Sequence, residues 1–204
     1  MRKLCLLFLL IGTYCYAGEK KYTVDSPDGK IQLAIIQTDA GELTYQLSVK
    51  RKQVIDASAL GFKTEDGLTF PFRGWKMGKV TRNKVNSVWK PLWGKRAVVP
   101  DKYNEMKLSF VNEAKSSDAL EVVARAYNEG VAFRYVSPQD AGSALELTTF
   151  NFAGDYTAWF YNGERHNIGP ERLTETDGER LPVMTVKAAD DLYLAIHEAC
   201  LDEG

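Results

Sequence analysis

One acidic side chain near the end of the chain is the strongest candidate for chemistry. Glu198 follows the apolar run Leu192–Ile196, which is typical of a β-strand covered on both faces. A carboxylate at the end of such a strand must be paired or must bind a cation, because an isolated charge is costly to bury. Ca²⁺ takes roughly six to eight oxygen ligands, of which Glu198 can supply about one or two. The residue therefore predicts one part of a metal site whose other ligands lie elsewhere.

The remaining catalytic residue types do not form a recognisable site. The sequence has only two histidines, His166 and His197. His197 and Glu198 are adjacent in a predicted strand, so their side chains point to opposite faces and cannot form a direct acid–base pair. A sugar epimerase, which needs a base and an acid in one concavity, is therefore disfavoured. Cys200 is the only cysteine outside the N-terminal leader, and we interpret it as a small buried apolar residue.

Aromatic rings are the second kind of candidate, because the apolar faces of sugars stack on them. The candidates for substrate binding are Trp89, Trp93 and Tyr103, which are close together in the sequence. The alternative is that these rings fill the core, as large aromatic side chains commonly do. Arg125 is expected to form only exposed cross-strand ion pairs with nearby glutamates, each contributing less than about 1 kcal/mol.

Period-two alternation of apolar and polar side chains indicates the elements that position these residues. Residues 31–37 and 43–49 predict one antiparallel hairpin, and residues 120–127 and 131–136 predict another. Further strands are predicted over residues 80–89, 106–112, 144–150, 157–161, 183–186 and 192–198. The charged stretch 162–180 is predicted to be a long loop. Many short strands, and no convincing amphipathic helix, predict an all-β sandwich.

The first 17 residues are predicted to be a signal peptide. Arg2 and Lys3 precede the apolar run 4–11, and Cys15-Tyr16-Ala17 offers a small-x-small cleavage pattern. The apolar run is shorter than the roughly 20 residues that span a bilayer, so no membrane anchor is expected after cleavage. Residues 18–204 then form one domain. They carry 24 basic and 27 acidic residues, and this balance does not predict a nucleic-acid-binding protein.

Five blocks of the mature sequence together resemble a known family. In chain order they are S-P-D-G-K at 26–30, V-I-D-A-S-A-L-G-F at 54–62, W-K-P-L-W-G with Y-N-E at 89–94 and 103–105, R-A-Y-N-E-G-V-A-F-R-Y at 125–135, and D-D-L-Y-L-A-I-H-E-A-C-L at 190–201. In this order and spacing they resemble the N-terminal domain of glycoside hydrolase family 97, whose members include α-glucosidases and α-galactosidases.

The resemblance implies a β-super-sandwich of the galactose-mutarotase-like type. In the family a (β/α)8 barrel follows this domain and carries the catalytic carboxylates, and the carbohydrate substrate is an α-glucoside or α-galactoside. The resemblance also implies that the glutamate matching Glu198 reaches across to ligate an active-site Ca²⁺. Because the family is mostly Gram-negative, it implies a secreted, periplasmic protein.

The sequence departs from the family pattern at its end. Residue 204 precedes any barrel, and in the family the sandwich continues past the Glu198 block, so its last strands are expected to be missing. Glycoside cleavage needs two carboxyl groups at a set separation, and no such pair can be assembled here. The chain is therefore expected to be inactive alone. Two alternatives stay open: a free-standing carbohydrate-binding module, and a gene fragment without a function of its own.

Overall fold

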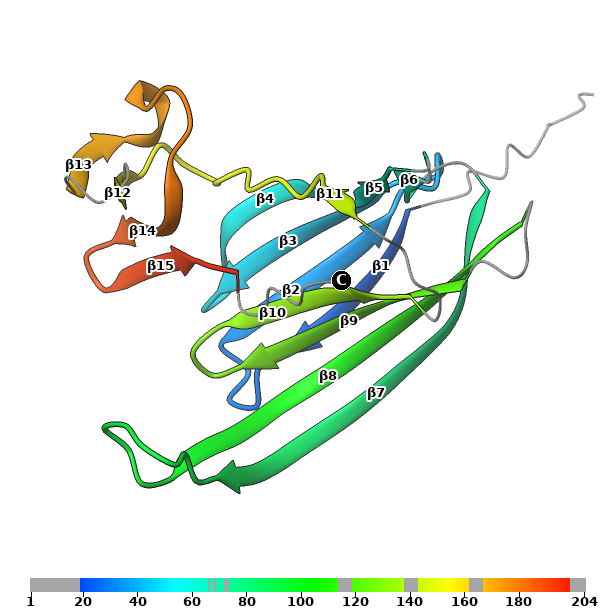
Figure 1. Ribbon diagram of the computed structural model, residues 1–204, viewed down its shortest axis with the longest axis horizontal. Helices are drawn as coiled ribbons and strands as arrows, with labels where there is room; N and C mark the ends of the chain where they lie inside the picture. Colours follow the sequence, from blue (N-terminus) through cyan, green and yellow to red (C-terminus); the bar gives the residue numbers. More distant parts are fainter. Residues whose placement is uncertain are drawn as a thin grey trace, which may run out of the picture.

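The computed structural model consists almost entirely of antiparallel strands (Figure 1). It describes residues 19–65, 67, 69–71, 74–113, 119–137, 143–161 and 167–198. The predicted signal peptide, His166 and Cys200 lie outside these ranges. Within them the helical content is one 3₁₀ turn, η1 (Leu173–Glu175), and no helix there is long and apolar enough to cross a bilayer. The predicted all-β class is confirmed.

Two four-stranded sheets form the body of the fold. The first sheet has the strand order β1-β2-β3-β4, with the bounds Lys20–Asp25, Ile31–Gln37, Leu43–Val49 and Lys52–Leu60. The second sheet has the order β10-β9-β8-β7, with the bounds Val131–Val136, Ala119–Tyr127, Val99–Asn112 and Trp75–Trp89. Both predicted hairpins are confirmed, because β2 pairs with β3 and β9 with β10 in antiparallel register.

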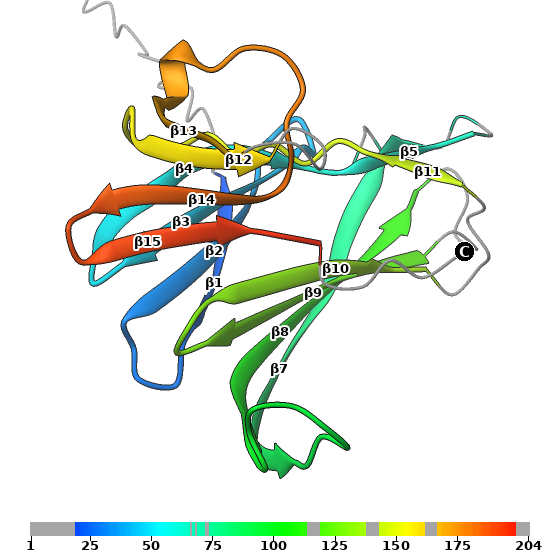
Figure 2. The ribbon, with the colours of Figure 1, turned by 60° about the vertical axis from the view of Figure 1, so that its left-hand side comes forward.

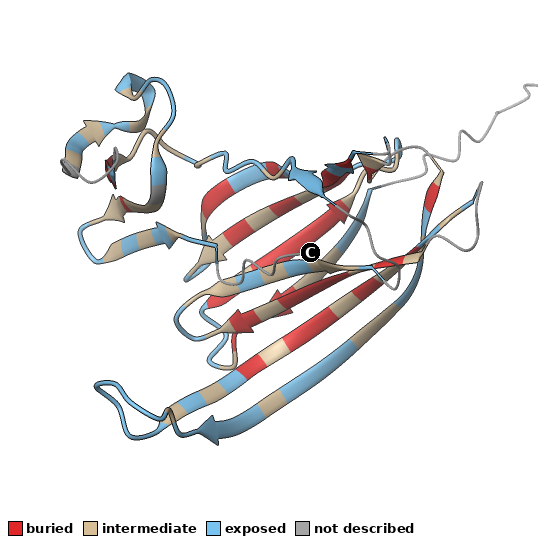
Figure 3. Ribbon diagram, viewed as in Figure 1, coloured by how far each residue is buried: buried red, intermediate tan, exposed pale blue. Residues whose placement is uncertain are grey.

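The hydrophobic core lies between the facing sides of these two sheets, where Figure 3 shows most of the buried residues. Leu33 and Ile35 on β2 are fully buried, as are Leu108 and Phe110 on β8. Burying a side chain of this size stabilises the folded state by about 1.5–3 kcal/mol. The alternation seen in the sequence is thus the signature of strands with one face in this core.

A small sheet and an irregular segment close one side of the sandwich. The small sheet has the order β11-β5-β6, with the bounds Ala144–Glu146, Phe62–Thr64 and Thr69–Phe70. The segment that follows β11 runs beside β4, because the Thr149 amide donates to the Ala59 carbonyl and the Ala153 amide to the Val54 carbonyl. The buried Tyr45 hydroxyl donates to the Thr149 carbonyl at 2.8 Å. The block at residues 54–62 therefore serves as a pairing edge for this segment.

A fourth sheet, which we call the end sheet, has the order β13-β12-β14-β15. Its bounds are Asn167–Arg172, Thr157–Tyr161, Leu181–Ala189 and Leu192–Ile196. It has a small core of its own, formed by Ala158, Phe160 and Val186. Leu192 and Leu194 also pack against the main core, and Lys50 forms an ion pair with Asp191 at 3.1 Å. These contacts attach the end sheet to the sandwich (Figure 2).

The prediction of one long loop over residues 162–180 was wrong, because this stretch contains β13 and η1. β13 pairs with β12, with Thr157 opposite Arg172 and Ala158 opposite Glu171. The Asp155 carboxylate accepts hydrogen bonds from the Thr174 amide and hydroxyl and holds the 3₁₀ turn against β12. The strand was not predicted because its sequence contains charged residues and the Gly169-Pro170 pair, which are unusual in strands. Its stability comes from pairing with β12.

Two of the family-like blocks meet although they are 100 residues apart in sequence. Asp28, in the turn between β1 and β2, accepts hydrogen bonds from the Ser26 hydroxyl at 2.6 Å and the Lys30 amide at 3.1 Å. The Asp28 amide donates to the Asn128 side chain, which lies between β9 and β10, at 3.0 Å. The Asn104 side chain adds a hydrogen bond to the Asp25 carbonyl at 2.7 Å. These bonds tie the two large sheets together at one end.

This turn predicts a pH-dependent contribution to stability. The Ser26 hydroxyl, the Lys30 amide and the Lys30 ammonium lower the pKa of Asp28 from its ordinary 3.8 to about 2. Because the folded-state pKa is depressed, the contribution is complete above about pH 4 and disappears as the pH falls towards 2. The difference in unfolding free energy between wild type and Asp28→Asn should therefore shrink across this window in urea titrations. A difference that stays constant from pH 7 to 2 would contradict this assignment.

Candidate functional site

The candidate metal ligand Glu198 lies just beyond the end of β15. Its residue is exposed, as is His197, and neither belongs to a strand. The expectation of a strand that continues to residue 198 was therefore wrong by two residues. The exposed carboxylate needs no ion pair within the domain, because water solvates it.

The expectation that this strand is covered on both faces was also wrong. Leu192, Leu194 and Ile196 are half-buried, whereas Tyr193 and Ala195 on the other face are exposed. Among the described strands β15 is the last of the end sheet and pairs only with β14. An outer strand with one packed face can still consist of apolar residues only. The sequence of β15 therefore did not indicate which of its two faces is exposed to solvent.

The described residues contain no group of three or more His, Cys, Asp or Glu side chains that could hold a metal ion. Among the described residues, Glu198 is therefore an exposed carboxylate that belongs to no cluster of possible metal ligands. Such a residue fits a Ca²⁺ site only if several oxygen ligands come from outside this domain, because one carboxylate fills about one or two of the six to eight positions.

The aromatic candidates separate into two environments. Trp89 at the end of β7 is 54% exposed, and Trp93 in the following loop is 87% exposed. Tyr103, on β8, is only 7% exposed. Trp89 and Tyr103 share one face of the β7–β8 ribbon, where Trp89 is opposite Val99 and Tyr103 is opposite Val85. The tryptophans therefore offer ring surface to a partner, and Tyr103 offers very little.

Tyr103 is instead part of a cluster that joins two family-like blocks. The Arg125 guanidinium lies over its ring, with the central carbon 4.4 Å from the ring centroid. Arg125 Nε donates to Glu105 Oε2 at 2.8 Å, and the Glu105 side chain is 8% exposed. The Tyr127 ring lies 5.0 Å from that of Tyr103. The ion pair expected on the surface is thus mostly buried, and this cluster holds β8 against β9.

Substitution of Glu105 tests the strength of this cluster. Glu105→Gln removes the charge partner of Arg125 and should lower the free energy of unfolding by about 1–3 kcal/mol in urea titrations, as charged hydrogen bonds commonly do. Glu113→Gln is the matched control, because its ion pair with Lys76 joins side chains that are 59% and 76% exposed. The control should change stability by less than about 1 kcal/mol. Equal effects of the two substitutions would show that burial of Glu105 adds nothing.

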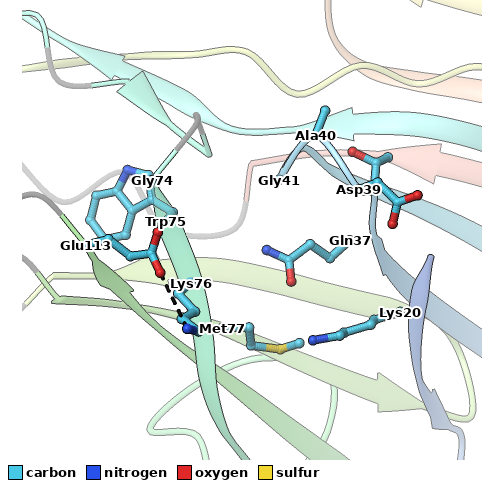
Figure 4. A pocket seen from close by; sticks show the side chains of 11 residues that line it. Lys20, Gln37, Asp39, Ala40, Gly41, Gly74, Trp75, Lys76, Met77 and Glu113 are labelled. Carbon is cyan, nitrogen blue, oxygen red and sulfur yellow. Dashed lines mark ion pairs between the residues drawn. The ribbon is translucent and has the colours of Figure 1, made fainter. Parts of the chain in front are cut away.

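A shallow hollow of about 710 Å³ lies where the start of β7 approaches β1 and the turn after β2 (Figure 4). Lys20, Gln37 and the Lys76–Glu113 pair face it, and its one aromatic side chain, Trp75, is 5% exposed. The Trp75 ring packs edge-on against Phe70 in the core, so it offers no stacking surface. The hollow contains none of the candidate site residues.

Tyr193 on β15 is among the exposed aromatic side chains that the sequence reasoning missed. It is 56% exposed, and its ring lies 6.5 Å from that of Trp159 on β12. The two rings share the outer face of the end sheet, with Tyr193 near the start of β15. Tyr193 was concealed because it lies inside an apolar run that was expected to be buried throughout.

Comparison with known proteins places these features in a family. The model of the family described as "Glycosyl-hydrolase 97 N-terminal" matches residues 24–203. A retaining α-galactosidase of Bacteroides thetaiotaomicron is 23% identical over 99% of this chain and 32% of its own length. A probable retaining α-galactosidase of Streptomyces bingchenggensis is 29% identical over 78% of this chain and 26% of its own length. The chain spans about a third or less of these relatives.

Solved structures agree with this placement. A glycoside hydrolase family 97 enzyme from Pseudoalteromonas sp. strain K8, in complex with panose, superimposes with a TM-score of 0.76 at 30% identity. The match covers 88% of this chain and 28% of that enzyme. A β-arabinopyranosidase has a TM-score of 0.73 at 20% identity, which shows likeness of fold alone. The ordered blocks, the antiparallel sandwich and the family match agree, and the chain belongs to the glycosyl-hydrolase 97 N-terminal family.

Proposed function

We propose that this domain faces carbohydrate in a family 97 glycoside hydrolase and supplies Glu198 as one ligand of a Ca²⁺ site. The polypeptide that follows the domain in the relatives would complete that site. The observation that carries the proposal is the position of Glu198, an exposed carboxylate two residues beyond the end of β15. The D-D-L-Y-L-A-I-H-E-A-C-L block supports it, since the matching glutamate has this role in the family that the sequence resembles.

The domain would contribute no catalytic carboxylate. Hydrolysis of a glycosidic bond needs two carboxyl groups about 5–5.5 Å apart in retaining enzymes or about 6.5–9.5 Å apart in inverting ones. Among the described acidic residues, Glu105, Asp155 and Asp191 are engaged in ion pairs within the fold. The function of the domain is therefore to position Glu198 and to present a surface that the rest of an enzyme contacts.

Calcium titration of the chain tests this proposal. Isothermal titration calorimetry should detect no Ca²⁺ binding tighter than about 1 mM, because a single carboxylate leaves most of the coordination positions to water. The chain should also release no chromophore from nitrophenyl α-glucoside or α-galactoside. Tight Ca²⁺ binding that is lost in Glu198→Gln would show a complete site in this domain. Turnover lost in the same variant would show that the domain is catalytic by itself.

A free-standing carbohydrate-binding module is the second candidate, favoured by the exposure of Trp89 and Trp93. Stacking of a sugar on either ring should change tryptophan fluorescence in a saturable way during titration with maltotriose. Unchanged fluorescence at millimolar sugar would remove this candidate. A gene fragment without function is the third, and a non-cooperative unfolding transition would favour it.

We also infer that the protein is secreted to the periplasm after cleavage near Ala17. The support is the charged, apolar and small-residue pattern of the first 17 residues. Mass spectrometry of the protein from a Gram-negative host should give a mature chain that begins at Gly18.

A further inference from the structure

The β7–β8 hairpin is much longer than the sandwich needs. β7 has 15 residues and β8 has 14, whereas β9 and β10 beside them have 9 and 6. In both ribbon views the far end of the hairpin extends beyond the other strands (Figures 1 and 2). From Arg82 to Trp89 every residue of β7 except the half-buried Val85 is exposed, so this end lies outside the core (Figure 3).

The end of this hairpin carries a concentrated apolar surface. We call residues 88–98 the hairpin tip. Its exposed fractions are 63% for Val88, 54% for Trp89, 102% for Leu92, 87% for Trp93 and 45% for Val98. Single exposed apolar residues are ordinary, but five large ones within eleven residues at one end of a hairpin are a concentration of the kind found at interaction sites. The surface therefore needs a partner that covers it.

The same hairpin is strongly basic. Residues 75–100 contain seven Lys or Arg residues and no Asp or Glu. Lys90, Lys95 and Arg96 at the tip are exposed, and no ion pair among the described residues engages them. The net charge of the whole chain does not indicate this local positive charge, because acidic residues predominate in the second half of the sequence. The partner should therefore present acidic side chains around an apolar surface.

Two simpler explanations account for only part of these features. Lysines on an outer strand protect it from pairing with other chains, which explains Lys79 and Lys84 on β7. This protection does not explain Trp93 and Leu92, which would promote association. A platform for neutral sugar would use the tryptophan rings but not the positive charge. A protein surface uses both.

The relatives indicate which protein surface this is. The chain matches an N-terminal family model and corresponds to 26–32% of the length of its relatives, so most of each relative lies outside the matched part. The tip lies within the matched residues and contains the W-K-P-L-W-G block. We propose that the hairpin tip docks this domain onto the polypeptide that follows it in family 97 enzymes, in an apolar recess rimmed by acidic side chains. This inference rests on the proposed function and names the contact that would bring Glu198 to its co-ligands.

A co-expression experiment tests the docking. The probe is the part of the Pseudoalteromonas sp. strain K8 enzyme that follows its region matched by this chain, produced with an affinity tag together with the full chain and used only when it is soluble and unfolds cooperatively on heating. The wild-type chain should co-purify with the probe, and the complex should weaken as the salt concentration rises. The triple variant W89S/L92S/W93S should lose at least about tenfold in capture, as expected for aromatic anchors at an interface. K95E/R96E should also reduce capture, through charge alone.

Matched controls separate docking from folding. L145S/L147S/L181S removes three apolar side chains that are 66%, 40% and 50% exposed but lie outside the hairpin, and it should be captured like wild type. Urea midpoints of all variants should be similar, because the tip contributes nothing to the core. Failure of the wild type to co-purify would overturn the proposal, as would equal capture of the tip variants. Flotation of the chain with anionic phosphatidylglycerol vesicles without capture by the probe would assign the tip to a lipid surface instead.

The two proposals fail separately. Glu198 lies on the end sheet side of the domain, so Glu198→Gln should leave capture unchanged. The same substitution should remove any stabilisation of the captured complex by Ca²⁺. Capture that depends on the tip but is insensitive to Ca²⁺ would overturn the metal proposal and keep the docking. Capture that requires Glu198 and not the tip would overturn the docking.

Discussion

Replacing Phe70 with alanine is expected to lower the free energy of unfolding by about 3–5 kcal/mol. Phe70 on β6 is fully buried, and its ring contacts those of Phe62, Trp75 and Phe110 at centroid distances of 5.7, 5.2 and 5.3 Å. These rings come from the small sheet and from both long strands of the second sheet. Truncation leaves a cavity between elements that are fixed by their own hydrogen bonds, so the cavity cannot collapse.

Urea denaturation followed by tryptophan fluorescence measures this effect. Phe150→Ala is the matched control, because Phe150 is 39% exposed and contacts one ring, that of Tyr45. Its expected cost is about 1–2 kcal/mol, since part of the ring already contacts water. If Phe70→Ala were no more destabilising than this control, the small sheet would not be part of the main core.

Replacing Gly169 with alanine is expected to destabilise the end sheet by about 2–5 kcal/mol. Gly169 has φ of +114°, which L-residues rarely adopt. A Cβ there would lie 2.4 Å from the Ala158 carbonyl oxygen and 3.0 Å from the Trp159 Cα. Both neighbours are backbone atoms of β12, so β13 would have to move away from the strand with which it pairs.

Amide hydrogen exchange is the sharpest readout for Gly169→Ala. Protection should fall in β12 and β13 and remain in β2, β3 and β8, because the two cores are largely separate. Gly130→Ala is the matched control: Gly130 has no positive φ, and its added Cβ meets nothing within 4 Å. It should be neutral or stabilising by up to about 1 kcal/mol. Unchanged protection in β13 would mean that the strand does not approach β12 this closely.

The family-like blocks have different physical roles in the structure. The blocks around Asp28, Glu105 and Arg125 hold the sandwich together, through the turn that meets Asn128 and through the buried ion pair. By contrast, the W-K-P-L-W-G run at residues 89–94 and the Glu198 side chain lie outside the core and present exposed groups. A sequence pattern alone does not distinguish a residue kept for packing from one kept for a partner.

The strands and the family could be read from the sequence, because both are encoded locally. Alternation over residues 31–37 and 43–49 records which side chains share a face, and a turn between two such runs specifies a hairpin. The ordered blocks record the family for the same reason, since each is a short run of residues at a set distance from the next. The metal assignment of Glu198 came from the apolar run before it and from this resemblance, and it stays a prediction.

Only the tertiary structure decided which faces are covered. Tyr103 is buried because Arg125 comes from another strand to cover it, and Trp93 is exposed because its hairpin extends past the opposing sheet. β13 exists because β12 pairs with it, and Glu198 is solvent-exposed because β15 ends two residues before it. Alternation along a strand determines two faces, but burial depends on what other segments bring to each face. Those segments are distant in sequence, so their contribution becomes visible only in the folded chain.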